Sequence, residues 1–149
     1  DPDTAITRDM MAQLFYNLEG KPAVTGNSGF TDVSENAWYA DAVTWAVKNN
    51  IVSGYGDGTF GPEDLLTREQ MTQLLYNYAQ YKGYDVSVRG DLSIFTDGGR
   101  TSSWAKEAMS WAVGADLLHG YAGYVTPTGT ATRAEAAQIL MAYCENIAK

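Results

Sequence analysis

The chain has 149 residues, of which 45% are hydrophobic and 12% aromatic, and this composition predicts one folded domain with a real core. Its formal net charge at pH 7 is −8, from 18 acidic and 10 basic side chains. This balance argues against nucleic acid and against an anionic membrane surface as partners, because phosphate contacts need clustered lysine and arginine. No apolar run approaches about 18 residues, so we expect no membrane insertion.

Three amphipathic helices are predicted along the chain, and each begins at the dipeptide Thr-Arg. These dipeptides stand at residues 7–8, 67–68 and 132–133, and apolar residues follow each of them at i, i+3, i+4 and i+7. Thr67 with Gln70 and Thr132 with Glu135 form capping-box patterns, in which two side chains satisfy free N–H groups at the helix start.

A second kind of segment lies between these helices. Residues 30–32 read Phe-Thr-Asp, residues 39–47 predict a short alanine-rich helix, and the glycine-rich residues 51–60 predict a tight turn. The segment recurs from Phe95, with a short helix over 105–113 and a Gly-Tyr loop at 120–121. A period this long predicts small repeated units that bury their apolar faces against their neighbours.

Catalysis and metal binding lack the residues they would need. The chain has one cysteine, Cys144, which we expect to be a buried, inert thiol, and one histidine, His119, which we expect on a solvent-facing loop. Asp57 lacks the spacing of a calcium loop and predicts a turn. With no Cys–His pair, zinc cluster or phosphate loop, we predict no enzyme activity, no catalytic residue, no metal and no cofactor.

The strongest binding candidates are Arg8, Arg68 and Arg133, each in the first turn of a predicted helix, where free N–H groups attract anions. A cation there opposes the helix dipole, so its threefold recurrence requires another reason. A guanidinium offers a planar fork that fits a carboxylate or phosphate. The structural alternative is a salt bridge to Asp32 or Asp97 within the repeat.

Aromatic side chains beside the predicted loops are the second set of candidates. Ring faces stack on sugars, so exposed rings next to an anion site would form a saccharide groove. The set is Trp38, Tyr55, Trp104 and Tyr121. For the two tryptophans of this set, burial in the core is an equally weighted alternative, whereas Trp45 and Trp111, inside the short helices, are predicted to be core residues.

The order of these pieces resembles the S-layer homology (SLH) repeat: Phe-Thr-Asp, Trp, Trp-Ala-Val, a Gly-Tyr loop, then Thr-Arg-Glu. The helical patterns predict an all-α fold, and the resemblance implies tandem repeats around a pseudo-threefold axis with short glycine-rich loops. The predicted boundaries are residues 1–20 for the C-terminal half of a first repeat, 21–29 for a connector, 30–83 for a second repeat, 84–94 for a connector and 95–149 for a third repeat.

The resemblance also implies a function. SLH domains anchor exported proteins non-covalently to the bacterial cell wall, and the implied partner is a secondary cell-wall polysaccharide carrying ketal-linked pyruvate, bound in grooves between repeats at the cell surface. The glycan-binding residues carried over are Arg8, Arg68, Arg133, Trp38, Ser53, Gly54, Tyr55, Trp104, Gly120 and Tyr121. Asp32, Asp97, Thr67, Thr132 and Glu135 are predicted to be structural.

Two other classes stay open at this point. The repeats could assemble with other protein chains without binding glycan, and a wall hydrolase would need a catalytic domain outside this segment. Arginines buried in aspartate pairs would favour the structural class, and arginines in open grooves would favour anchoring. The half-repeat before residue 20 predicts at most two competent grooves and an exposed apolar strip, which a second copy of the chain could cover in a homodimer.

Overall fold

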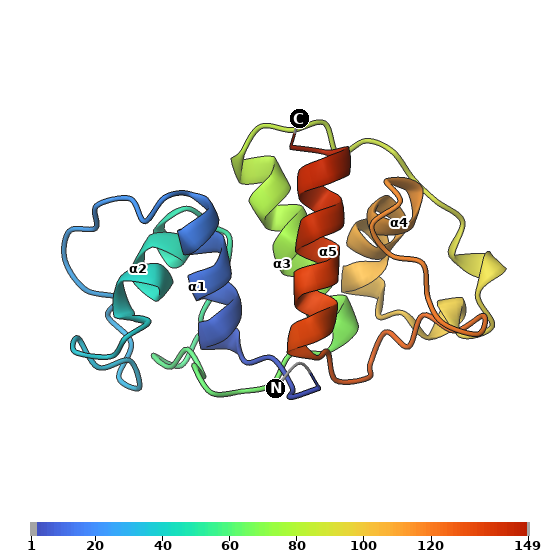
Figure 1. Ribbon diagram of the computed structural model, residues 1–149. Helices are drawn as coiled ribbons and strands as arrows, with labels where there is room; N and C mark the ends of the chain where they lie inside the picture. The colour runs from blue at the N-terminus through green and yellow to red at the C-terminus, as the bar shows by residue number, and fades with distance from the viewer. Residues whose placement is uncertain (1–2, 149) are drawn as a thin grey trace. The chain divides into compact units, whose positions relative to one another are not determined.

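The computed structural model describes residues 3–148, and the regular structure in this range is helical (Figure 1). The predicted all-α class is therefore confirmed, while the pseudo-threefold axis stays a prediction. The α-helices are α1 (Arg8–Leu18), α2 (Ala40–Lys48), α3 (Arg68–Tyr81), α4 (Lys106–Gly114) and α5 (Arg133–Asn146). Short 3-10 helices occupy Leu92–Ile94, Gly98–Arg100 and Ser103–Ala105.

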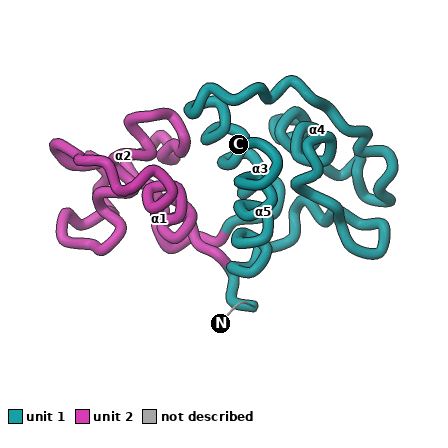
Figure 2. The backbone as a smooth tube through the Cα atoms, turned by 45° about the horizontal axis from the view of Figure 1, so that its top comes forward, with its two compact units in different colours: residues 1–5, 66–149 teal, residues 6–65 magenta. Residues whose placement is uncertain are grey.

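The chain divides into two compact units, and neither coincides with one sequence repeat (Figure 2). Unit 2, residues 6–65, combines α1 from the first Thr-Arg segment with α2 and the glycine loop of the next repeat. Unit 1, the remainder of the chain, combines α3 with α4, the second loop and α5. Each Thr-Arg helix at the start of a unit therefore packs with the front half of the following repeat.

Unit 2 has its core between α1 and α2. Met11 and Phe15 of α1 are completely buried, and so are Ala42 and Ala46 of α2, whose small side chains let the two helices approach closely. Trp45 is 5% exposed and lies with its ring centroid 5.7 Å from that of Tyr16. The prediction that Trp45 is a core residue is confirmed.

Unit 1 is built around α3, which contacts α4 and lies beside α5 (Figures 1 and 2). Trp111 of α4 is fully buried, as predicted, with its ring 5.2 Å from Tyr76 of α3. Tyr78 of α3 and Tyr143 of α5 place their ring centroids 5.7 Å apart. Aromatic contacts therefore hold both neighbouring helices to α3.

Each Thr-Arg helix begins at an antiparallel bridge to the residues that precede another such helix. Thr7 pairs with Leu65 in unit 2, and in unit 1 Thr67 pairs with Thr130 and Ala5 with Thr132. Backbone N–H groups of the first helical turns donate across these bridges to carbonyl oxygens. The donor and acceptor pairs are Arg8 to Asp64, Asp9 to Pro62, Arg68 to Gly129, Glu69 to Pro127 and Arg133 to Thr4, at 2.8–2.9 Å.

The two predicted capping boxes are both present. The hydroxyls of Thr67 and Thr132 accept from the backbone N–H groups of Gln70 and Glu135, and these side chains accept from the threonine N–H groups in return. At α1 the Thr7 side chain caps nothing and instead donates to Asp9, which is 5% exposed and also accepts from the Met10 N–H. Asp9 thus accepts the hydrogen bond from the Met10 N–H that the threonine of a capping box would otherwise accept.

Asp32 and Asp97 fasten each front segment to its loop. Asp32 accepts from the N–H groups of Phe60 (2.9 Å) and Gly61 (2.8 Å), and Asp97 accepts from those of Val125 and Thr126, both at 2.8 Å. Burial raises the pKa of Asp32, but these backbone hydrogen bonds outweigh it, so that the pKa lies below its usual value. The two carboxylates therefore accept hydrogen bonds from loop N–H groups and, within residues 3–148, do not form the salt bridges to arginine that the structural alternative predicted.

Two expectations about side-chain exposure are decided by the structure. Cys144 is exposed, so the expectation of a buried thiol was wrong. Tyr143 faces the core, and because successive residues of a helix are rotated by roughly 100°, the side chain of Cys144 points away from it. Trp38 and Trp104 are 63% and 55% exposed, which decides against the core alternative. Trp38 precedes α2, and Trp104 lies in the short 3-10 helix before α4.

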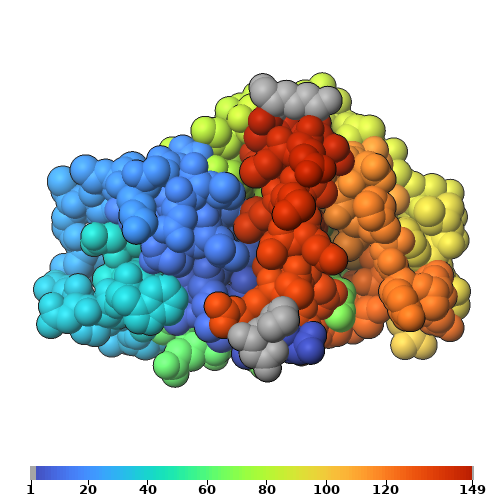
Figure 3. Space-filling model, in the orientation of Figure 1, coloured from blue at the N-terminus to red at the C-terminus, as the bar shows by residue number. Residues whose placement is uncertain are grey.

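An exposed strip runs along α5, whose atoms reach the surface in Figure 3 (red). Ala137, Met141 and Cys144, spaced i, i+4 and i+7, are all exposed, and Met141 is 64% exposed. The apolar strip expected where the missing half-repeat would pack, and its burial by a second copy of the chain, both stay predictions.

The loop attachment in unit 1 can be tested with Asp97→Ala. The substitution leaves the N–H groups of Val125 and Thr126 without their acceptor, and Val125 is buried, so we expect a loss of about 1–3 kcal/mol of unfolding free energy. Urea denaturation measures this loss. Asp97→Asn, which retains one acceptor oxygen, should fall between wild type and alanine, and an Asp97→Ala protein as stable as wild type would contradict the assignment.

Candidate functional site

The starts of α1 and α3 are not open to an anion. The first N–H groups of α1 and α3 donate to carbonyl oxygens across the bridges described above, and the Arg133 N–H at the start of α5 does the same. A helix N-terminus attracts anions through such N–H groups when they are free. The binding capacity of the Thr-Arg segments therefore resides in the guanidinium groups.

Arg8 extends from α1 onto the glycine loop of unit 2. Its Nε donates to the carbonyl oxygen of Phe60 (2.9 Å), and its Nη2 donates to that of Ser53 (2.6 Å). The guanidinium carbon lies 4.4 Å from the ring centroid of Phe60 and 4.9 Å from that of Tyr55, so that two π faces flank the cation. The predicted residues Arg8, Ser53 and Tyr55 are thus brought together.

No carboxylate forms an ion pair with Arg8 among residues 3–148. The nearest acid in the loop, Asp64, accepts instead from the Tyr55 hydroxyl at 2.7 Å. Burial lowers the pKa of the Arg8 guanidinium, against the fields of Tyr55, Asp64 and Asp32, which raise it. Arg8 is therefore a half-buried cation that backbone carbonyls orient and that has no ion pair with a carboxylate of the described residues.

Gly54 and Gly120 hold equivalent places in the two loops, and both are required for packing. A Cβ added to Gly54 would collide with the ring of Phe30, and one added to Gly120 would lie 2.7 Å from that of Phe95. Gly120 also has φ +74°, which side chains rarely adopt. The absence of a side chain at these glycines therefore lets each loop pack against the phenylalanine ring of its own front segment.

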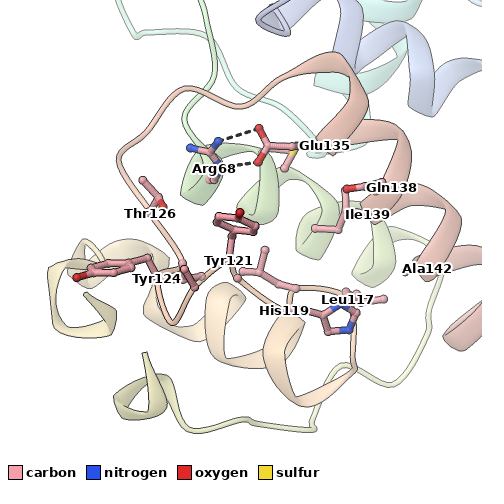
Figure 4. Close-up of a pocket in the computed structure, with 15 residues that line it drawn as sticks. Arg68, Leu117, His119, Tyr121, Tyr124, Thr126, Glu135, Gln138, Ile139 and Ala142 are labelled. Carbon is pink, nitrogen blue, oxygen red and sulfur yellow. Dashed lines mark hydrogen bonds and ion pairs between the residues drawn. The ribbon is translucent and has the colours of Figure 1, made fainter. Parts of the chain in front are cut away.

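Arg68 has a different partner in unit 1. Its Nε and Nη2 donate to Oε2 (2.5 Å) and Oε1 (2.9 Å) of Glu135 on α5, which is a two-pronged ion pair (Figure 4). The two side chains are 24% and 31% exposed. Burial raises the pKa of Glu135, but the bonds from Arg68 and from the Thr132 N–H outweigh it and lower the pKa.

The Arg68–Glu135 pair lies on the wall of a pocket of about 880 Å³, with His119 toward the other end and Tyr121 between them (Figure 4). Tyr121 is 87% exposed, and His119 bonds to Asp116 at 2.7 Å on the solvent side, as expected for this loop. The pocket brings together three predicted residues, Arg68, Gly120 and Tyr121, and omits Trp104. Its other principal lining residues are Met71, Leu117, Tyr124, Thr126, Gln138, Ile139 and Ala142.

Three predicted residues are not brought to either arginine site. Arg133 is exposed in the first turn of α5, with its backbone N–H on Thr4. Trp38 makes an edge-to-face contact with Tyr39, at 5.1 Å between centroids, and does not belong to the contacts of Arg8. Trp104 is exposed away from the residues that line the Arg68 pocket.

Sequence reasoning missed two contributors, Phe60 and the charge of Glu135. Phe60 supplies both a carbonyl and a ring face to Arg8, and its signal was the Gly-Thr-Phe end of the loop. Glu135 was predicted to be structural as a cap, and its cap is confirmed, but its ion pair joins residues 67 positions apart and has no local signal.

The family model of the S-layer homology domain matches residues 29–72 and 94–137, which is more than half of the chain. The chain belongs to the S-layer homology family. Similar proteins include the exoglucanase XynX of Acetivibrio thermocellus, 33% identical over 97% of this chain and 13% of that protein. The surface-layer 125 kDa protein of Lysinibacillus sphaericus is 30% identical over 99% and 12% respectively. Members of this family lie at the bacterial cell surface.

Two further comparisons give one curated protein and one solved structure similar to this chain. The cellulosome-anchoring protein of A. thermocellus is 24% identical over 93% of the chain and 32% of that protein. A solved undecaheme cytochrome from the S-layer of Carboxydothermus ferrireducens is 18% identical, with a TM-score of 0.46 over 95% of this chain and 21% of that one. The chain spans about a tenth of the first curated relatives. An exoglucanase and a surface-layer protein share this segment, so the enzyme activity in the first name belongs to other domains of that protein.

The described helices include none with the length and apolar character to cross a membrane.

The lowered pKa of Glu135 predicts a pH-dependent contribution to stability. A carboxylate whose pKa is depressed by folding stabilises fully above its ordinary pKa of 4.5, and this stabilisation disappears as the pH falls through the folded value. We expect Glu135→Gln to be less stable than wild type at pH 7, with the difference shrinking below pH 4.5. Urea denaturation at several pH values measures it, with the exposed Glu145→Gln as control. A difference that persists unchanged in acid would contradict the ion pair.

Proposed function

We propose that this SLH domain anchors an exported protein non-covalently to the cell wall by binding a secondary cell-wall polysaccharide that carries ketal-linked pyruvate. Membership of the family supports the anchoring role, and relatives named as surface-layer and cellulosome-anchoring proteins agree with it. The ligand chemistry rests on the site in unit 2.

The observation that carries the proposal is the state of Arg8. A half-buried cation is disfavoured unless an anion or strong acceptors compensate it. Two backbone carbonyls compensate Arg8 in part, and they fix the plane of its guanidinium while leaving the charge itself unpaired. A carboxylate on a ligand would supply the missing charge through hydrogen bonds that are about twice as strong as neutral ones.

Pyruvate held as a ketal presents such a carboxylate directly against a sugar ring. At Arg8 the sugar would meet the exposed edge of the loop formed by Ser53, Gly54 and Tyr55, and Tyr55 is 52% exposed. An aromatic face next to a fixed cation suits a ligand that carries both an apolar ring face and an acid. The pocket of unit 1, with Gly120 and Tyr121, supplies a second contact for the same polymer. Several weak contacts along one polymer raise the overall affinity without tight individual sites.

The alternative, a protein-assembly module without glycan binding, is favoured by one observation. Arg68 is joined to Glu135 and thereby holds α3 to α5, so one of the Thr-Arg arginines has a structural partner. The exposed tryptophans Trp38 and Trp104 would then serve protein contacts. Pull-down with purified wall polymer, with and without its pyruvate, separates the two functions, because only the anchoring function depends on the polymer.

Arg8→Ala tests the proposed site. Loss of a charge-assisted hydrogen bond costs about 1.5–3 kcal/mol, which corresponds to roughly 10- to 150-fold weaker binding of a short pyruvylated fragment. Arg8→Lys should recover only part of this, because an ammonium retains the charge but lacks the planar fork. Isothermal titration calorimetry measures both variants.

Arg100→Ala is the matched control, because it removes the same charge from an exposed arginine outside both sites. We expect its affinity to equal that of wild type. Chemical removal of pyruvate should abolish the advantage of wild type over Arg8→Ala. Equal affinity of wild type for pyruvylated and depyruvylated polymer would refute the proposed ligand.

A further inference from the structure

Arg8 and Arg68 stand at equivalent positions of two repeats but are in opposite electrostatic states. Arg8 bonds to two backbone carbonyls and has no ion pair among the described residues, whereas Arg68 bonds to both oxygens of Glu135. The Arg68 site contains a carboxylate that neutralises its arginine, and the Arg8 site does not. The two sites are therefore suited to ligand groups of different charge.

The Nε–Nη2 edge of the Arg68 fork is not open to a second carboxylate. Glu135 occupies the edge formed by Nε and Nη2. Nη1 lies against the backbone of Gly129, where an added Cβ would collide with it, and the Arg68 N–H donates to the carbonyl of the same glycine at 2.9 Å. A ligand carboxylate at this guanidinium would either displace Glu135 or lie next to it, and both arrangements bring two like charges close together, which disfavours them.

The capping box does not require the charge of Glu135. Gln70 holds the same N3 position in α3 and completes the same capping box with an uncharged amide. The N3 residue of α1 is Met10, so α5 alone among the three Thr-Arg helices of the sequence carries a carboxylate there. The charge at Glu135 therefore has its function toward Arg68.

With the Arg68 charge compensated, the pocket offers aromatic and apolar walls and a few uncharged polar groups. Tyr121, Tyr124 and Ile139 supply ring and aliphatic surface, and Thr126 and Gln138 supply hydroxyl and amide groups. The pocket's histidine is already bonded to an aspartate on the solvent side. Such a lining matches the C–H faces and hydroxyls of a sugar ring without an acid.

We propose that Glu135 determines the specificity of the unit 1 pocket: it serves as a built-in carboxylate for Arg68, so that this pocket takes an uncharged glycosyl residue while Arg8 takes the carboxylate-bearing one. This inference rests on the proposed function and assigns different sugar residues of the polymer to the two sites. It predicts that the domain binds one pyruvylated residue for each chain.

The test converts the Arg68 pocket into an acid-binding site with Glu135→Gln, which retains the capping box as Gln70 does. It is carried out in an Arg8→Ala background, with short wall-polymer fragments that carry pyruvate or have lost it as the two probes. With Glu135 present, we expect equal affinity for the two fragments. After the Glu135→Gln substitution, the pyruvylated fragment should bind at least tenfold more tightly than the depyruvylated one. Glu145→Gln, the same charge change at an exposed site on α5, should leave the affinities equal.

A second measurement uses the wild-type protein alone. The depyruvylated fragment should shift the NMR signals of Tyr121 and Ile139 in the pocket, and it should leave those of Tyr55 in place. If Arg8→Ala retains a preference for pyruvate that Arg68→Ala removes, or if the pocket signals do not move, the division of ligands is overturned and wall binding stands. If wild type binds neither fragment, the proposed function itself fails, and the division of ligands fails with it.

Discussion

The short bridge at the start of each Thr-Arg helix is the constraint on which the rest of the structure depends. It uses the first N–H groups of the helix for backbone carbonyls, as with Arg8 on Asp64 and Arg68 on Gly129, and so removes the usual anion site of a helix terminus. The same bridge fixes the Cα of the arginine beside the loop of the following repeat. The guanidinium therefore lies on that loop, and the site is made by two successive repeats rather than by one.

Within this common frame, the surroundings of the guanidinium decide what each arginine can bind. Arg8 meets carbonyls and the ring faces of Tyr55 and Phe60, which orient a cation without cancelling its charge. Arg68 meets Glu135, which cancels the charge and joins α3 to α5. Removing one partner of such a pair leaves the other charge uncompensated, so the pair contributes to stability as well. Because glutamine completes the same cap in α3, the charge of Glu135 acts on Arg68 and, in our proposal, on what the pocket binds.

The sequence predicted what depends on local pattern and repetition. Helix starts, capping boxes at Thr67 and Thr132, and the core positions of Trp45 and Trp111 all follow from spacing, and all are present. Contacts set by tertiary packing could not be predicted: Glu135 meets an arginine 67 residues away, and the rotation of α5 exposes Cys144. The family resemblance pointed to the loops that lie beside Arg8 and Arg68 but not to the side chains that these arginines contact, because repeats share backbone positions while single side chains at N3 differ.

The net charge of −8 bears on how a negatively charged polymer could reach Arg8. Long-range repulsion from the acidic surface opposes the approach of any polyanion, although beyond about 8 Å salt screens it at physiological ionic strength. Attraction must therefore arise at short range, where a carboxylate reaches the guanidinium of Arg8 and a sugar ring reaches the aromatic loop. If the proposal holds, such a surface would reject anionic polymers that cannot fit this site and retain those that can, because specificity is a difference between affinities. For the ligand proposed above, charge repulsion over the domain and charge attraction at one residue would act together to select a polymer whose acids are sparse and sterically defined.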